Sequence, residues 1–427
     1  MSVSLHKQFD EHPILEPHFR QELVIRLLGE LRRGPRSFAT LVEAAEGAYP
    51  IDVQTVLDEL RTQQKVAISE SGDWRGVDGP AQEGLSQNCY GRQSGPKDGL
   101  PEPHPLDFDW RFTAQTLSDL TNSLELSSST RVAVLGAPTL YRHLTDIGTK
   151  STLFDRNASL LERLRNDGYA SVRDCNFLEF PQLESGFDCA LADPPWYTEH
   201  YEAFIEAARC LLVPSGRLFL SVLPRLTRPS AAEDRIEILD VAQSLGFDLT
   251  AVAPRALRYV SPPFETEALK ADGVIELGDW RSGDLFSFVL GTRPPKHIKP
   301  REPISKEVWQ AYEVGKTTIK IKTEPVEVSQ EFKFEAVSSG GEFRLRSVSR
   351  RSPARSKVNL WTSRNIALAV SKVVVLAEVL QRISGTESIH DALGSVSYEY
   401  QLTDAEREKL KDLLQLLFED AGLEWTW

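Results

Sequence analysis

Short apolar runs alternate with segments of helical periodicity between residues 130 and 293. Parallel strands need long crossovers, which are usually helices, so this alternation predicts a parallel sheet with helices on both faces. We therefore predict a doubly wound, Rossmann-like α/β domain over residues 106–293. Strands are expected at 132–135, 151–154, 170–173, 187–191 and 217–222, with two more at 249–258 and 285–290 that close one edge. Helices are expected at 141–145, 158–167, 200–211 and 236–245.

The N-terminal region has a different pattern. Apolar residues with helical spacing occur at 22–32, 38–45 and 53–60, and a hairpin with its turn at Gly72-Asp73 is expected after them. This order is typical of a winged helix over residues 1–80. Such a fold can place its third helix in a DNA groove, but an interaction or dimerisation module fits that helix equally well. Residues 81–105, rich in Gly, Pro, Ser and Gln, are predicted to be a linker.

Residues 294–427 are predicted to form an α+β region to which the sequence assigns no chemistry. A linker is expected at 294–305, antiparallel strands within 319–343, and helices at 363–383 and 403–418. The second helix begins with the capping box Thr403-Asp-Ala-Glu406. An arginine-rich stretch at 344–357 also contains Ser and Pro, and we interpret it as a solvated linker rather than a nucleic-acid-binding arm.

Length and charge limit the classes of protein that the chain can represent. A chain of 427 residues is long enough for two or three domains. The formal net charge of −13 argues against coating of nucleic acid by bulk electrostatics, although a local basic face remains open. The four cysteines lack the paired spacing of a metal site, so no metal is expected. With no apolar leader or membrane span apparent, we expect a cytoplasmic protein.

The first of two loops at strand ends follows the apolar run 132–135 and reads Gly136-Ala-Pro-Thr139-Leu-Tyr141. The small residues Gly136 and Ala137 let the backbone approach a ligand closely, and Pro138 fixes the turn before a helix. In an open parallel sheet, ligands bind outside the carboxyl ends of the strands. The helix start is then expected to face the carboxylate end of a cofactor.

Polar side chains end the next two strands. Asp155 stands where an acid accepts hydrogen bonds from ribose hydroxyls, and Asp174 and Asn176 are placed to hold the edge of a base. Because the usual G-x-G-x-x-G run is absent, a purely structural turn at Gly136 fits this part of the sequence as well.

The second loop, Asp193-Pro194-Pro195-Trp196, follows the apolar run 187–191. Two prolines lock the backbone and remove two donors, so the Asp193 carboxylate and the Pro194 carbonyl form a rigid pair of acceptors. Such a pair orients an NH2 nitrogen toward an electrophilic methyl group, and the rate comes mainly from that alignment. Trp196 offers a flat surface for a planar base. The alternative is a Pro-Pro turn with a core tryptophan.

Together the two loops resemble the N6-adenine methyltransferase-like family, which includes lysine methyltransferases that act on translation elongation factor. The matching residues are Gly136, Ala137, Pro138, Thr139 and Tyr141 in the first loop and Ala192, Asp193, Pro194, Pro195 and Trp196 in the second. The resemblance implies a class I methyltransferase fold, S-adenosyl-L-methionine as cofactor and an amine nitrogen as acceptor. It also implies that a first loop without the glycines of the G-x-G-x-x-G run is normal for this family.

The chain is also similar to branched-polyamine synthases, which transfer aminopropyl groups and have an Asp-Pro-Pro loop. Those enzymes carry acidic residues directly after the first-strand glycine, where this chain has Ala137 and Pro138. We therefore favour methyl transfer over aminopropyl transfer.

Trp196 favours adenine N6 in nucleic acid as the acceptor, with a protein lysine next. Candidate substrate contacts are Tyr197, Arg225, Tyr259 and Phe264, the last two in a loop expected to cover the substrate. A degenerate methyltransferase fold that serves only as a binding scaffold is the alternative from another class. The N- and C-terminal regions are candidate surfaces for a second copy of the chain or for a partner protein.

Overall fold

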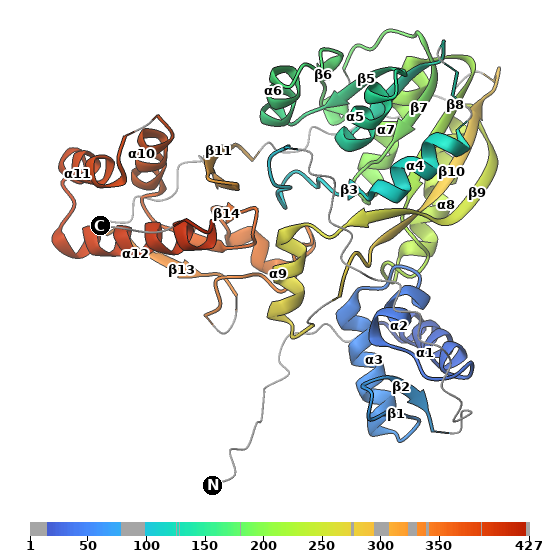
Figure 1. The fold of residues 1–427 in the computed structure, drawn as a ribbon, viewed down its shortest axis with the longest axis horizontal. Helices are drawn as coiled ribbons and strands as arrows, with labels where there is room; N and C mark the ends of the chain where they lie inside the picture. The colour runs from blue at the N-terminus through green and yellow to red at the C-terminus, as the bar shows by residue number, and fades with distance from the viewer. Residues whose placement is uncertain are drawn as a thin grey trace. The chain divides into compact units, whose positions relative to one another are not determined.

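The computed structural model describes residues 15–77, 99–124, 126–127, 129–179, 181–274, 277–293, 307–322, 331–338, 341–385 and 387–423. The chain divides into two compact units (Figure 1). The first unit comprises Met1–Tyr90 and Leu223–Ile236, and the second comprises Gly91–Val222 and Glu237–Trp427. The predicted linker at 81–105 lies outside the described residues up to residue 98, and the one at 294–305 lies wholly outside them.

The first unit contains the predicted three helices and hairpin. Helices α1 (Pro17–Leu31), α2 (Phe38–Ala44) and α3 (Pro50–Thr62) precede the antiparallel strands β1 (Val66–Ile68) and β2 (Trp74–Gly76). Helix α1 begins before its apolar stripe, because Pro17 has a backbone suited to a first helical position. The stripe itself packs in the core, where Leu23, Leu27 and Leu31 are buried.

The second unit contains an eight-stranded sheet with the order β3-β9-β10-β8-β7-β4-β5-β6. Its strands are β3 (Arg111–Phe112), β4 (Arg131–Leu135), β5 (Lys150–Asp155), β6 (Val172–Asp174), β7 (Phe187–Ala192), β8 (Leu212–Val222), β9 (Phe247–Val260) and β10 (Ser282–Leu290). Strands β4 to β8 pair in parallel, whereas β10, β9 and β3 are antiparallel. The mixed α/β fold is therefore confirmed, with the two predicted edge strands in place.

The strand order reverses between β4 and β7, because the chain runs from β4 outward to β5 and β6 and then returns to β7. Ligands of open α/β sheets bind in the crevice at such a point. Both predicted loops follow these two strands. The fold thus brings Gly136 and Asp193 to the same edge of the sheet.

The predicted helices are present as α5 (Pro138–Asp146), α6 (Ala158–Asn166), α7 (Thr198–Leu211) and α8 (Ala231–Ser244), of which α8 begins in the first unit and ends in the second. Helix α5 packs beside β5 and α6 beside β6 (Figure 1). The Asn157 side chain caps α6 by accepting a hydrogen bond from the Leu160 backbone at 3.2 Å. Strand β3 was not predicted, and neither were three helical elements: α4 (Ala114–Ser123), α9 (Pro263–Ala271) and the 3₁₀ turn η1 (Phe177–Glu179).

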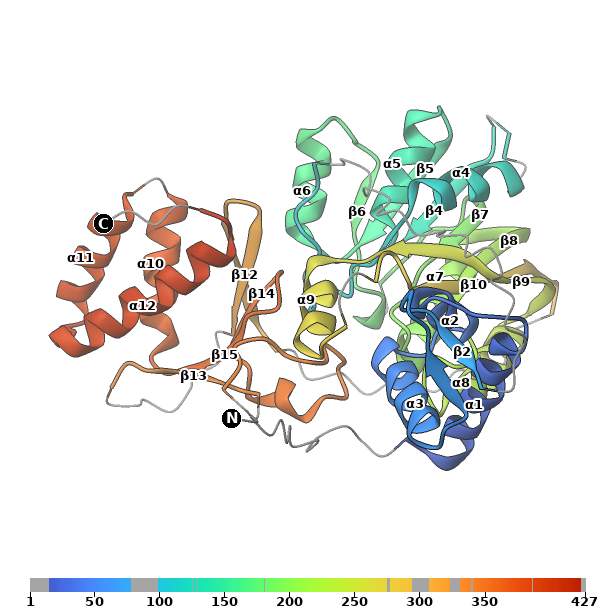
Figure 2. The same ribbon diagram turned by 60° about the horizontal axis from the view of Figure 1, so that its bottom comes forward.

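The C-terminal part of the second unit is α+β. Strands β11 (Trp309–Val314), β12 (Thr317–Lys322), β13 (Phe334–Ala336), β14 (Leu360–Thr362) and β15 (Ala367–Val370) form an antiparallel sheet with the order β11-β12-β14-β15-β13. Helices α10 (Val373–Ser384), α11 (Ile389–Glu399) and α12 (Asp404–Asp420) share a core with this sheet (Figure 2). The predicted capping box at Thr403 and Glu406 is present.

Two expectations for this region were wrong. The helix predicted at 363–383 begins only at Val373, because Asn365 and Lys372 have backbone φ angles of +71° and +47° and turn the chain into and out of strand β15. The stretch 344–357 is not a solvated linker, since Leu345 is 2% exposed and the Arg344 guanidinium donates to Asp420 at 2.7 Å.

Within the described residues, no helix has both the length and the apolar character to span a membrane. Nor do the described side chains gather His, Cys, Asp or Glu residues in a group suited to a metal ion. The domain boundaries at residues 80, 106 and 293 stay predictions.

Candidate active site

The two loops touch each other at the switch point of the sheet. The Asp193 backbone N–H donates to the Leu135 carbonyl at 3.1 Å, and the Gly136 N–H donates to the Phe154 carbonyl at 3.0 Å. Gly136 has a φ of +69°, and a Cβ atom there would stand 3.3 Å from the Asp193 carbonyl oxygen and 3.1 Å from the Phe204 ring. Glycine is therefore required both for the turn and for the close approach of the two loops.

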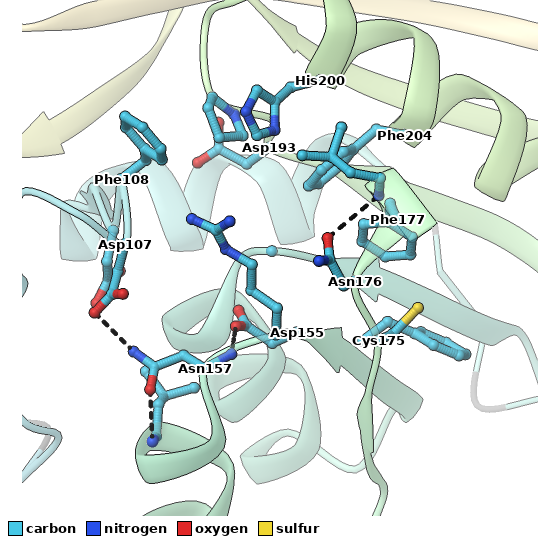
Figure 3. Close-up of a pocket in the computed structure, with 17 residues that line it drawn as sticks. Asp107, Phe108, Asp155, Asn157, Cys175, Asn176, Phe177, Asp193, His200 and Phe204 are labelled. Atoms are coloured by element: carbon cyan, nitrogen blue, oxygen red, sulfur yellow. Dashed lines mark hydrogen bonds between the residues drawn. The ribbon is translucent and has the colours of Figure 1, made fainter. Parts of the chain in front are cut away.

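A pocket with about 630 Å³ of empty space, part of it open to solvent, joins the two loops. Figure 3 shows Asp193 and His200 on one side of it and Asp155 and Asn157 on the opposite side. Its lining combines acidic groups with aromatic and small side chains. The acidic residues are Asp107, Asp109, Asp155 and Asp193.

The Asp193 carboxylate is held by a short chain of hydroxyl groups. The Tyr259 hydroxyl donates to Asp193 Oδ1 at 2.7 Å, and Ser221 Oγ lies 2.6 Å from the same hydroxyl. Because the single proton of Tyr259 goes to Asp193, Ser221 has to be the donor to Tyr259. Burial raises the pKa of Asp193 from 3.8 to about 7, although the hydroxyl bonds oppose this rise. Asp193 is thus a fixed carboxyl group that changes charge near neutral pH.

Asp155 ends strand β5 on the opposite side of the pocket. Its Oδ1 accepts a hydrogen bond from the Asn157 backbone at 2.8 Å. Burial raises the pKa of Asp155 to about 7, and the nearby Asp109 and Asp107 add to the rise. The second carboxylate oxygen has no hydrogen bond among the interactions found for the described residues, so it is a candidate acceptor for a ligand hydroxyl.

The segment before strand β3 closes a third side of the pocket. The Asn157 amide donates to Asp107 at 3.1 Å, as the dashed line in Figure 3 shows. Asp107 also pairs with Lys320 of the C-terminal sheet, and this cation lowers the pKa of Asp107 although burial opposes ionisation. Asp109 pairs with Arg111 at 2.8 Å. Two of the four pocket carboxylates therefore already have cationic partners.

Of the predicted site residues, the structure brings five together around the pocket: Gly136, Asp155, Asn176, Asp193 and Pro195. The others from the two loops do not line it. Ala137, Pro138, Thr139 and Tyr141 are buried at the start of α5 and Pro194 is buried behind Asp193, whereas Asp174 is exposed at the end of β6.

Trp196 lies beside the pocket lining rather than within it. Its ring packs against Tyr259 with centroids 6.0 Å apart and planes at 80°. The Arg281 guanidinium stands 5.2 Å from the centroid of the Trp196 ring and 3.8 Å from that of Trp110. A base that stacks on Trp196 would have to share the ring with Arg281.

The predicted substrate contacts lie in different environments. Tyr197 is half-buried beside Phe108, whereas Arg225 lies in the first unit and donates to Glu22 at 3.0 Å. Tyr259 and Phe264 are each 1% exposed. The loop expected to cover the substrate is instead the end of β9 and the start of α9, because both rings pack in the core.

Several pocket residues were not predicted, including Asp107, Phe108, Arg156, His200 and Phe204. Asn157 also lines the pocket and could have been found from its N-cap position two residues after Asp155. The segment around Phe108 carries no such signal, because it reaches the pocket through the pairing of Arg111 and Phe112 with Val260 and Tyr259.

Comparison with known proteins addresses the central part of the chain. Residues 109–240 match the model of a family described as "Probable N6-adenine methyltransferase". The predicted family resemblance is confirmed over these residues. The match supports S-adenosyl-L-methionine as the cofactor. No curated protein matches the sequence.

A solved structure from Thermus thermophilus has a similar fold. A mutein of a branched-chain polyamine synthase, in complex with N4-aminopropylspermidine and 5′-methylthioadenosine, is 14% identical with a TM-score of 0.50, covering 68% of this chain and 94% of its own. The synthase itself is 14% identical with a TM-score of 0.48, covering 66% of this chain and 90% of its own. At this identity, the first likeness shows the fold alone.

The residues around the pocket suit S-adenosyl-L-methionine in two respects. A Cβ at Gly136 would fill the narrow space between the loops, and Asp155 lines the same pocket. We expect Asp155 to hold the ribose hydroxyls, and the Gly136 backbone to lie against the methionine part. S-Adenosyl-L-methionine, when bound, supplies the electrophilic methyl group.

Replacing Tyr259 with phenylalanine is expected to lower the rate of methyl transfer about tenfold, since one charge-assisted hydrogen bond to Asp193 is lost. Cofactor binding should change little. In the wild type, the hydrogen bond from Tyr259 stabilises the ionised form of Asp193. Without that bond, the pKa of Asp193 should rise, and the midpoint of the pH–rate profile should move to higher pH. Steady-state kinetics across pH measure both effects.

Tyr312→Phe is the matched control, because Tyr312 is also buried but its hydroxyl has no hydrogen-bond partner among the described residues. An equal loss of rate in both variants, or an unchanged pH midpoint in Tyr259→Phe, would show that Tyr259 acts only as a packing residue.

Proposed function

We propose that the chain is an S-adenosyl-L-methionine-dependent N-methyltransferase whose favoured acceptor is N6 of adenine in nucleic acid. The observation that carries the proposal is the single pocket that joins Asp155, a candidate ribose ligand, to Asp193, a candidate amine ligand. The family match over residues 109–240 supports the same reaction.

Alignment of the amine is the main contribution of the protein in this proposal. The Asp193 carboxylate and the Pro194 carbonyl accept hydrogen bonds from the amino group, and the Ser221–Tyr259 chain keeps the carboxylate in place. The nitrogen lone pair then points toward the methyl donor beside Gly136. After transfer, Asp193 can take the proton that the nitrogen releases, because its pKa of about 7 lies near neutral pH.

The remaining predicted residues keep supporting roles in the proposal. Asn176, in the pocket lining, is placed to meet the edge of the cofactor's adenine. Trp196 acts from beside the pocket, sharing its ring with Arg281. We further propose that the three helices and hairpin of the first unit form a winged helix that serves substrate or partner binding.

Transfer of an aminopropyl group to a polyamine is the second candidate. Four carboxylic acids line the pocket, and acidic groups suit a cationic amine. The fold likeness to the polyamine synthase points in the same direction. Against this candidate, Asp107 and Asp109 already pair with Lys320 and Arg111.

An acceptor assay tests the two candidates together. The protein is incubated with methyl-labelled S-adenosyl-L-methionine and, separately, with single-stranded DNA, RNA, a lysine-rich protein and spermidine, and the products are digested and identified by mass spectrometry. The proposal predicts N6-methyladenine from one nucleic acid and none from Asp193→Asn. Methyl label found only in lysine would contradict the proposal. So would an aminopropylated spermidine formed when decarboxylated S-adenosyl-L-methionine replaces the methyl donor.

A further inference from the structure

The mouth of the pocket carries an unusual concentration of arginine around one aromatic residue. Phe108, which lines the pocket, packs edge-on against Tyr197 and His200 at centroid distances of 5.7 and 5.8 Å. Two guanidinium groups lie over the Phe108 ring, that of Arg156 at 5.8 Å and that of Arg355 at 5.5 Å. The first arginine follows strand β5, and the second belongs to the C-terminal region.

The same segment of the C-terminal region places a third guanidinium at the mouth. Arg350 stands 4.8 Å from the centre of the Tyr197 ring, and its backbone N–H donates to the Tyr197 hydroxyl at 3.2 Å. Its guanidinium donates to Glu199. The arginine-rich stretch is therefore docked against the α7 end of the pocket.

Two more cations of this segment, Arg351 and Lys357, are exposed. Among the interactions of the described residues, neither side chain has an ion pair or hydrogen bond. They are thus available to a ligand without loss of an existing contact.

Two of the guanidinium groups at the mouth donate to backbone carbonyls among the described residues, Arg156 to Leu106 at 3.1 Å and Arg355 to Val348 at 3.2 Å. Glu199 is the carboxylate that pairs with Arg350. Burial, with Arg350 and Arg156 nearby, lowers the pKa of Arg355 although Tyr197 and Glu307 oppose this. An anion at the mouth would relieve this repulsion.

We propose that Arg156, Arg350, Arg351, Arg355 and Lys357 form a phosphate-binding rim that holds the backbone of a single-stranded nucleic acid while one adenine enters the pocket. The rim rests on the proposed function and extends it by naming the substrate class, which is single-stranded nucleic acid. Arginine and lysine hold phosphates, and the rings of Phe108 and Tyr197 give a surface on which a neighbouring base can stack.

The charge of the rim also selects between substrates. A polyamine or a lysine side chain is a cation and would be repelled by the rim, whereas a polyphosphate backbone is attracted. A single strand fits better than a duplex, because a base has to leave the stack before its amino group can reach Asp193. The net charge of −13 then restricts nucleic acid to this local face.

The test measures binding of a labelled single-stranded oligoadenylate, as RNA and as DNA, to Arg351→Gln/Lys357→Gln at several salt concentrations. The double variant should bind about tenfold more weakly, and its slope of log affinity against log salt should be smaller by about 1.4, or about 0.7 for each lost phosphate contact. Affinity for S-adenosyl-L-methionine should stay unchanged, which also confirms folding.

The matched control is Arg165→Gln/Lys316→Gln, which removes two exposed cations from the end of α6 and from the β11–β12 turn. It should bind the oligonucleotide as the wild type does. Equal affinity and equal salt slope in both double variants would overturn the rim, as would wild-type binding of spermidine in preference to oligoadenylate.

Methyl transfer separates failure of the rim from failure of the proposed function. Rim-dependent binding of the oligonucleotide without methylation of adenine would reject the proposed function and leave the rim in place. Methylation with an unchanged KM in Arg351→Gln/Lys357→Gln would reject the rim and leave the proposed function in place.

Discussion

Asp193→Asn is expected to lower the methyl-transfer rate by about 100- to 1,000-fold, the loss that follows removal of one preorganised polar group from an active site. The amide oxygen can still accept from Tyr259, so the loop should keep its shape. What is lost is the negative charge that holds the amino group and accepts its proton. Single-turnover kinetics with saturating cofactor measure this loss directly.

The same substitution is expected to stabilise the protein at alkaline pH. The folded-state pKa of Asp193, about 7, lies above the ordinary 3.8, so the folded protein binds this proton more tightly than the unfolded chain. Stability from this group is complete below pH 3.8 and is lost as the pH rises through 7. Asparagine does not ionise, so the melting temperature of the variant relative to that of the wild type should rise as the pH increases from about 4 to 7 and stay constant above pH 7.

Asp188→Asn provides the comparison, because Asp188 lies at the other end of β7 and its side chain is 43% exposed. It should change neither the rate nor the pH dependence of melting. A variant at Asp193 that loses activity and stability together at pH 8 would indicate a structural role instead. Wild-type transfer should itself increase as the pH rises through about 7, because the carboxylate is the active form.

The sequence was sufficient to predict the strands that form the centre of the sheet. Residues 132–135 and 187–191 are almost wholly apolar, as expected for strands that are buried on both faces. Because the loops follow directly from such strands, Gly136, Asp155 and Asp193 could be assigned to one edge of the sheet without coordinates. The pocket joins these three residues.

The partners of these residues could not be predicted, because they arise from pairings of strands distant in sequence. Tyr259 reaches Asp193 only because β9 and β10 lie antiparallel beyond β8, which a period-two pattern does not specify. Arg350 reaches Tyr197 across 153 positions of sequence. Its stretch was interpreted as a linker because composition records charge but not contacts.

The error at 363–383 has a different physical cause. The run 366–380 is apolar at nearly every position, and continuous apolar runs fit a buried strand as well as a buried helix. The decisive feature is the left-handed backbone of Lys372, with φ at +47°, which ends the strand segment before helix α10. A lysine in that conformation has no signature in a single sequence.

Asp155→Ala is expected to weaken binding of S-adenosyl-L-methionine by about 100-fold, because a carboxylate that accepts hydrogen bonds from hydroxyls contributes roughly 1.5–3 kcal/mol per bond. Asp155 lines the pocket opposite Asp193 (Figure 3), so the loss should appear in cofactor affinity and not in the rate at saturating cofactor. Titration calorimetry measures the affinity. Asp167→Ala, at an exposed position after α6, is the control and should bind normally.

The pH dependence of binding gives a second, independent signature of Asp155. Its pKa of about 7 in the free protein means that much of this carboxyl group is protonated at neutral pH, and hydroxyl donors bind the ionised form. Cofactor binding should therefore release a fraction of a proton near pH 7 and weaken as the pH falls below 7. Calorimetry in two buffers of different ionisation enthalpy detects that proton. Unchanged affinity in Asp155→Ala, with no proton released by the wild type, would remove Asp155 from the cofactor site and with it the proposed orientation of the ligand.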